Sequence, residues 1–189
     1  MSTWKMTLQE IVDATGGKSL SQIKDEFSGV GTDTRTDLSG KIFVALKGEN
    51  FDAHEFLDKA LGAGAAALIV HRLPSEARAI LEKITVVEVP DTLKAFQALG
   101  CYWRRKMNAK ILALTGTNGK TTTKEFAAQI IGAKRDVHYS KGSFNNHWGV
   151  PMTLLALEPS HEVALVEMGM NHPGELSELC AIAEPDAVA

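Results

Sequence analysis

This sequence has few of the features that place a chain in a specialised class of protein. It has two cysteines, Cys101 and Cys180, which lie far apart and fit no metal-binding spacing. None of its six histidines forms a metal-spaced pair. Cysteines used so sparingly predict a reduced, cytoplasmic protein rather than a disulfide-stapled or zinc-binding one.

Long apolar runs and an excess of positive charge are also missing. No run approaches the roughly 20 apolar residues of a membrane-spanning helix, and the first residues, MSTWKMTLQE, lack the apolar core of a signal peptide. The net charge of −3 gives no basic field for nucleic acid. We therefore predict no membrane and no nucleic-acid partner.

Signals for helices and strands alternate along the first half of the chain. A helix is expected to begin at the capping box of Thr7 and Glu10 and to end at Gly16-Gly17. The further expected elements are strands at 41–46, 66–70 and 85–89 and helices at 55–63 and 75–83. This alternation predicts a small N-terminal α/β domain.

A long helix follows, with Asp91 as its N-cap. Its apolar residues recur every three or four positions, which indicates one core-facing stripe. They are Leu93, Phe96, Leu99, Trp103 and Met107. We place the domain boundary after this helix, which gives domains at 1–108 and 109–189.

The second domain again alternates strand and helix. Strands are expected at 111–114, near Val137 and at 163–167, and helices at 120–131, 151–157 and 174–182. The last residues, DAVA, read as the start of another strand. We therefore expect an incomplete P-loop-type parallel sheet, and a chain that is a fragment of a longer protein.

The most informative stretch is ILALTGTNGKTTTKE, residues 111–125. An apolar strand, a glycine turn and a helix start are the layout of a phosphate-binding loop. Lys120 would reach the terminal phosphates, and the Thr121 hydroxyl would hold Mg²⁺. The first glycine of the full Walker pattern is absent, because Leu114 stands in its place. An ordinary strand–turn–helix junction is the competing interpretation.

Other polar residues follow predicted strands or lie in loops. Glu167 ends the strand 163–167, at the sheet edge where ligands bind, and either binds Mg²⁺ or is a solvated carboxylate. Asn145 and Asn146 are either turn formers or contacts to a polar substrate. Arg35, in the segment Asp33-Thr34-Arg35, could grip a diphosphate, or that segment is a solvated loop.

Several of these segments together resemble the Mur ligases of bacterial cell-wall synthesis. GTDTR and IFVALKGENFDAH are similar to the uridine-nucleotide-binding domain of members that act late in the pathway. TGTNGKTTTKE is similar to the family's ATP loop, which also lacks the first Walker glycine. FNNHWGVPMTLL and VEMGMNHPGE are most similar to members that add D-alanyl-D-alanine.

The resemblance implies ATP-dependent amide formation between a UDP-muramoyl-tripeptide and D-alanyl-D-alanine through an acyl phosphate. It implies ATP and Mg²⁺ as ligands, with Lys120 and Glu167 as catalytic residues and Thr121 and Glu167 at the metal. The implied ATP-binding residues are Gly116, Thr117, Asn118, Gly119, Lys120, Thr121 and Thr122. The implied substrate-binding residues are Thr32, Asp33, Thr34, Arg35, Lys47, Gly48, Asn50, Asp52, His54, Asn145 and Asn146.

Family members continue beyond this length, with a completed sheet, a carbamylated lysine and a domain for the incoming substrate. The fragment is therefore expected to be inactive alone. Three alternatives stay open: the Mur ligase that adds the third amino acid, a folylpolyglutamate synthase, and a non-catalytic nucleotide-binding module. The DTR-containing first domain argues against the folylpolyglutamate synthase.

Overall fold

The computed structural model describes residues 4–48 and 51–189. Contacts between residues divide the chain into two compact units, Met1–Phe96 and Gln97–Ala189. The division falls inside helix α3 (Thr92–Lys106), earlier than the boundary that we placed at residue 108. The second half of this helix therefore contributes to the second unit, where the Trp103 indole donates to the Leu157 carbonyl (2.9 Å).

The first unit is built on a five-stranded sheet with the order β2-β7-β6-β5-β4. Its strands are β2 (Lys18–Ser21), β4 (Val30–Gly31), β5 (Ile42–Val44), β6 (Ala67–Val70) and β7 (Thr85–Glu88). β4 to β7 run parallel, and β2 is an antiparallel edge strand. Its short helices are η1 (Ala53–Phe56), α2 (Leu57–Gly62) and η2 (Ser75–Glu82), of which η1 and η2 are 3₁₀ helices.

The first helix, α1 (Leu8–Thr15), begins and ends as its sequence predicts. Thr7 and Glu10 form a reciprocal capping box, and Gly16 ends the helix with φ 64°, which a residue with a side chain rarely adopts. Two short strands flank it in an antiparallel pair, β1 (Met6–Thr7) and β3 (Glu26–Phe27).

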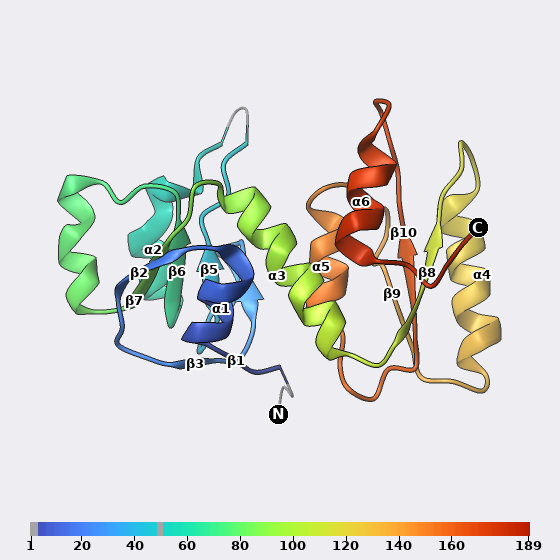
Figure 1. Cartoon of the computed structure of the whole chain (residues 1–189), viewed down its shortest axis with the longest axis horizontal. Coiled ribbons are helices and arrows are strands. Elements are labelled where there is room, and N and C mark those ends of the chain that lie inside the picture. Colours follow the sequence, from blue (N-terminus) through green and yellow to red (C-terminus); the bar gives the residue numbers. More distant parts are fainter. Residues whose placement is uncertain (1–3, 49–50) are drawn as a thin grey trace. The chain divides into compact units, whose positions relative to one another are not determined.

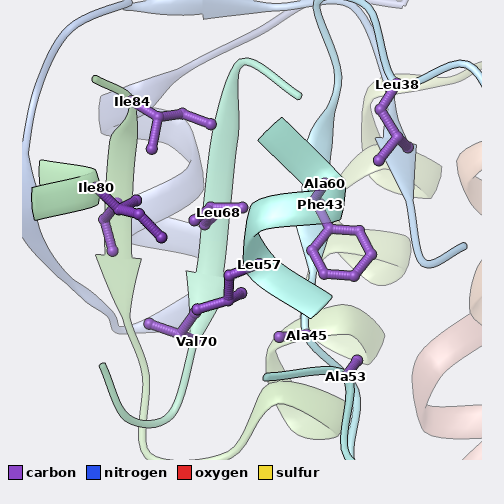
Figure 2. Close-up of a cluster of buried hydrophobic side chains, with 11 residues drawn as sticks. Leu38, Phe43, Ala45, Ala53, Leu57, Ala60, Leu68, Val70, Ile80 and Ile84 are labelled. Atoms are coloured by element: carbon purple, nitrogen blue, oxygen red, sulfur yellow. The ribbon is translucent and has the colours of Figure 1, made fainter. Parts of the chain in front are cut away.

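The core of the first unit lies between α2 and the sheet. Figure 2 shows Leu57 and Ala60 of α2 facing side chains of the central strands, among them Phe43 and Leu68. Both strand residues are almost fully buried, and Ile80 anchors η2 to the same cluster. Because β5 is buried along its whole length, the loop that follows it starts from a fixed point.

The second unit has a four-stranded sheet with the order β11-β8-β10-β9, and all its strands are parallel. They are β8 (Lys110–Leu114), β9 (Val137–Tyr139), β10 (Val163–Glu167) and β11 (Ala187–Val188). The helices are α4 (Lys120–Gly132), α5 (Gly149–Leu155) and α6 (Glu175–Ala183). In Figure 1, α4 covers one face of this sheet and α5 and α6 cover the other. The carboxyl ends of β8 and β10 are therefore neighbours.

The structure differs from the sequence-based prediction in several places, among them the helix expected at 55–63, which divides into η1 and α2. The strands β1 to β4 were not predicted, because each has only two to four residues and little alternation. The segment expected as a regular helix at 75–83 is a 3₁₀ helix, with Ile80 as the buried side chain among those described. Helix α5 begins two residues earlier than expected, because its first turn accommodates Pro151, which needs no amide partner there.

Within the described part of the chain, no helix is long and apolar enough to cross a membrane.

Candidate functional site

The loop between β8 and α4 forms the first part of the candidate site. Gly119 occupies the N-cap of α4 with φ 77°, and Gly116 has φ 143°, so both positions favour glycine. Among the described residues, no side chain caps this helix. The first amides of α4 and the positive end of its dipole are therefore left to face an anion, as in phosphate-binding loops.

Lys120 folds back over this loop. Its ammonium group donates to the Gly116 carbonyl oxygen at 2.6 Å. The positive charge therefore lies beside the glycine turn, where the terminal phosphates of a bound nucleotide would need neutralising.

The carboxylate of Glu167 lies behind the loop, at the carboxyl end of β10. The Thr121 hydroxyl donates to Oε2 (2.9 Å) and the Asn145 amide donates to Oε1 (2.9 Å). Glu167 is only 1% exposed, so the alternative of a solvated carboxylate does not hold. Three predicted site residues from three separate elements are thus brought into direct contact.

These oxygens suit Mg²⁺. The ion prefers one or two carboxylates together with phosphate oxygens and water, rather than a cage made wholly of protein groups. Glu167 and the Thr121 hydroxyl supply hard oxygen donors beside the anion-facing loop. Across residues 4–48 and 51–189, no cluster of three or more acidic, histidine or cysteine side chains forms an alternative metal site.

Asn146 has a different environment from Asn145. Its side-chain oxygen accepts from the backbone amides of Trp148 (3.1 Å) and Gly149 (3.0 Å), so it shapes the turn into α5. Gly149 packs tightly on this loop: a Cβ there would lie 2.5 Å from the Phe144 carbonyl carbon. Asn145 therefore contacts Glu167, whereas Asn146 is held by local structure.

Sequence reasoning missed a second buried charge in this unit. Lys124, one turn beyond Lys120 on α4, is fully buried and lies 3.6 Å from Glu167. Its helical spacing from Lys120 was the available signal, but a lysine on a helix is usually solvated.

The first unit contains a cavity of about 560 Å³ that four of the predicted substrate-binding residues line. They are Thr32, Asp33, Thr34 and Arg35. The Arg35 guanidinium donates to both carboxylate oxygens of Asp33 and holds the pKa of that carboxyl at about 2. The Arg35 side chain is 88% exposed, so it remains accessible to a ligand.

The rest of the cavity wall was not predicted, and much of it is aromatic. Phe51 and Phe56 stack with ring centroids 5.3 Å apart, and the Lys59 ammonium lies 4.8 Å from the Phe56 ring centre. Phe43 and Ala53 complete this part of the wall. The signal was two phenylalanines that bracket the polar segment DAHE, whereas our prediction weighed only hydrogen-bonding groups.

Asp52, which is partly exposed, and the buried His54 lie beside this cavity and are not among the residues that line it. The His71 amide donates to His54 Nε2 (3.1 Å), so the proton is on Nδ1, which donates to Asp52 Oδ1 (2.7 Å). Burial would raise the pKa of Asp52, but hydrogen bonds from the His54 backbone and ring hold it at about 2. Asp52 also pairs with Arg72 (2.9 Å).

The remaining predicted substrate-binding residues are in the loop after β5. Lys47 pairs with Asp52 in a short β-bridge, and the Gly48 amide donates to the Phe51 carbonyl (2.8 Å). These contacts close the loop that carries Phe51. Asn50 lies outside the described residues.

Known proteins are similar to this chain in sequence and in fold. Residues 114–189 match the Mur ligase middle domain. The UDP-N-acetylmuramoyl-tripeptide–D-alanyl-D-alanine ligase of Bacillus subtilis is 38% identical over 186 residues, which are 97% of this chain and 40% of the relative. The chain spans between 32% and 40% of the length of the curated relatives that it matches.

Solved structures of similar fold come from the same family as these relatives. A crystal structure of MurF from Acinetobacter baumannii has a TM-score of 0.90 and 38% identity, and it covers 100% of this chain and 41% of its own. MurF from Thermotoga maritima in complex with ADP has a TM-score of 0.73 and 30% identity, and it covers 84% of this chain and 36% of its own.

Proposed function

We propose, on the premise that this chain belongs to the Mur ligase family, that it carries the nucleotide and UDP-sugar sites of an amide ligase. The reaction joins D-alanyl-D-alanine to UDP-N-acetylmuramoyl-tripeptide with hydrolysis of ATP, in peptidoglycan synthesis. The relatives are more than twice as long as this chain, so the reaction is proposed for a protein of their length.

One observation carries the nucleotide half of this proposal. Thr121, Glu167 and Asn145 converge at the carboxyl edge of the sheet, directly beside an uncapped helix start and Lys120. In parallel α/β sheets this edge is where ligands bind. ATP occupies the loop 116–122 in this proposal, and Lys120 neutralises its β- and γ-phosphates.

Phosphoryl transfer to the tripeptide carboxylate depends on positioning and on neutralising charge, and it needs no protein nucleophile. Thr121 and Glu167 would hold Mg²⁺, which would supply part of that neutralisation when bound. Asn145 fixes Glu167 through the bond to Oε1, while Oε2 accepts from the Thr121 hydroxyl. The dipeptide amine then attacks the acyl phosphate and releases phosphate.

The cavity of the first unit binds the UDP-sugar in this proposal. Arg35 is positioned at its wall, and its exposed guanidinium suits a diphosphate because it presents paired donors. The stacked pair of Phe51 and Phe56 adds a flat apolar surface, which suits the uracil ring. Asp52 and His54 support this wall from behind, through η1.

The cytoplasm remains the predicted compartment, and both cysteines are unpaired.

The test is phosphate release by the complete protein, coupled to a spectroscopic readout. It is offered UDP-muramoyl-tripeptide and ATP with D-alanyl-D-alanine, and separately UDP-muramoyl-dipeptide with single amino acids. Phosphate release that requires both UDP-muramoyl-tripeptide and D-alanyl-D-alanine supports the proposal. Release with single amino acids points to the ligase of the preceding step, and nucleotide binding without release points to a non-catalytic module.

A further inference from the structure

Lys124 is a buried lysine that the proposed chemistry does not use. It is 0% exposed, on the face of α4 turned toward the sheet. A buried ammonium group is costly unless other groups take up its hydrogen bonds and charge. Its partners therefore indicate why a lysine is placed there.

The partners of Lys124 come from three segments, the turn after β9, helix α4 itself and β10. Its ammonium donates to the carbonyl oxygens of Ser140 and Gly142, both at 2.6 Å. It also lies 3.6 Å from Glu167 Oε2 and 3.4 Å from Glu125 Oε1. Glu125 is partly exposed, so its charge is screened, whereas that of Glu167 is not. The lysine therefore joins the turn after β9 to the buried carboxylate.

Ser140 is held from its other side by Glu167 itself. The Glu167 amide donates to the Ser140 hydroxyl oxygen at 3.1 Å. Further along the same loop, the Gly169 amide donates to the Asn145 carbonyl at 2.8 Å. Lys124, Ser140 and Glu167 thus form a closed set of contacts, and this set fixes the loop that delivers the Asn145 amide to Glu167.

We infer that Lys124 is a positioning residue for the metal-bound nucleotide: it holds the Ser140–Gly142 turn and the Glu167 carboxylate together, behind the phosphate loop. Lys120 acts on the phosphates directly, whereas Lys124 acts only through Glu167 and the loop that ends at Asn145. The inference rests on the proposed function in one respect, the assignment of Mg²⁺ to Thr121 and Glu167.

The first test measures amide hydrogen exchange by NMR in the chain without ligands. Lys124→Met keeps the side-chain volume and removes the charge and the donors. Lys134→Met is the matched control, because Lys134 is exposed. We expect Lys124→Met to speed exchange at the Glu167 and Gly169 amides by about tenfold or more. The Met168 amide, bonded to the Leu114 carbonyl, should change by less than about threefold.

Equal acceleration at all three amides, or none at any, would overturn the inference, because Lys124 would then be a general core residue. If Lys124→Met does not fold, Lys124→Met/Glu167→Gln decides the matter. If the double variant folds, the single variant failed because it left the Glu167 charge buried without its lysine, which supports the inference. Failure of both variants to fold overturns it.

The second test titrates ADP by calorimetry, with Mg²⁺ and then with EDTA. In Lys124→Met we expect the affinity with Mg²⁺ to fall by about tenfold and the affinity in EDTA to stay within about twofold, since the loop amides and Lys120 are unchanged. If Lys124→Met keeps the full gain in ADP affinity that Mg²⁺ gives, the proposed role of Lys124 is overturned, but the metal assignment is not. Absence of that gain in the unmodified protein would instead overturn the metal assignment on which the inference rests.

Discussion

The cavity of the first unit is walled by aromatic rings and an exposed ion pair, whereas the site of the second unit consists of backbone amides and buried charges. Arg35 is 88% exposed and meets its partner in water, where a salt bridge adds little to stability. Glu167 and Lys124 are almost fully buried, and each depends on its partners. A ligand can therefore recruit Arg35 at small cost to the fold, but a change at Glu167 or Lys124 disturbs the whole site.

The largest expected effect is that of Lys120→Ala on turnover. Removing this charge should lower the rate of the complete enzyme by at least about 10²–10³-fold, the scale seen when one charge-stabilising group is lost from an active site. The fold should be preserved, because among the described residues the Lys120 ammonium donates only to the exposed loop, at the Gly116 carbonyl. Steady-state phosphate release and circular dichroism provide the measurements, and an active, folded variant would contradict the phosphate-loop assignment.

The Arg35→Ala variant is the most direct test of whether the two units bind different ligands. We expect it to weaken UDP-sugar binding by about tenfold, because a charge-assisted contact is lost. Lys120→Ala should leave that affinity nearly unchanged, since the two residues lie in different units. Calorimetric titration of both variants with the UDP-sugar checks this, and unchanged binding in both would refute the role of the first unit.

Phe56→Ala tests the aromatic wall with a smaller effect. The loss of one ring from a stacked pair is worth about 0.5–1.5 kcal/mol beyond the buried area, so UDP-sugar binding should weaken severalfold. The control is Phe126→Ala, an exposed phenylalanine on α4 of the second unit. Equal affinities in the two variants would show that the wall does not contact the ligand.

The smallest expected effect is a pH dependence that the two units share. Burial lowers the pKa of both His54 and His138 below the ordinary 6.5. The unfolded chain therefore binds protons near pH 6.5 that the folded chain does not, and the free energy of unfolding falls as the pH drops below that value.

Urea unfolding at about pH 7 and about pH 5, followed by resolved NMR signals of each unit, measures this dependence. His54→Gln should flatten the dependence of the first unit and leave that of the second unit. An unchanged slope in the first unit would mean that another group titrates there.

The parts that sequence could predict are those set by short-range rules. The glycine loop and the Thr7 capping box need only neighbouring residues. The meeting of Thr121 with Glu167 followed from one general rule, because carboxyl ends of parallel strands share an edge. The roles assigned to these residues in ATP and Mg²⁺ binding stay predictions.

The parts that it could not predict depend on burial. Lys124 has the sequence context of a solvated helix residue, and only its contacts with the Ser140 turn show otherwise. Phe51 and Phe56 are large apolar residues of the kind usually found in a core, yet they line a cavity. The ring nitrogens of His54 are taken up by Asp52 and His71, and its predicted contact with the substrate stays a prediction. In each case the deciding contact is one that local pattern does not encode.

The strand order of the second unit sets the time at which its site forms. β10 lies between β8 and β9, although both of these precede it in the chain. The loop and α4 depend on local contacts and can form early, but Thr121 finds its carboxylate 46 residues further on. During synthesis, a nascent chain that has not reached Glu167 presents a phosphate loop without its acidic partner. Assembly of the Thr121–Glu167 pair therefore marks the insertion of the central strand into its sheet.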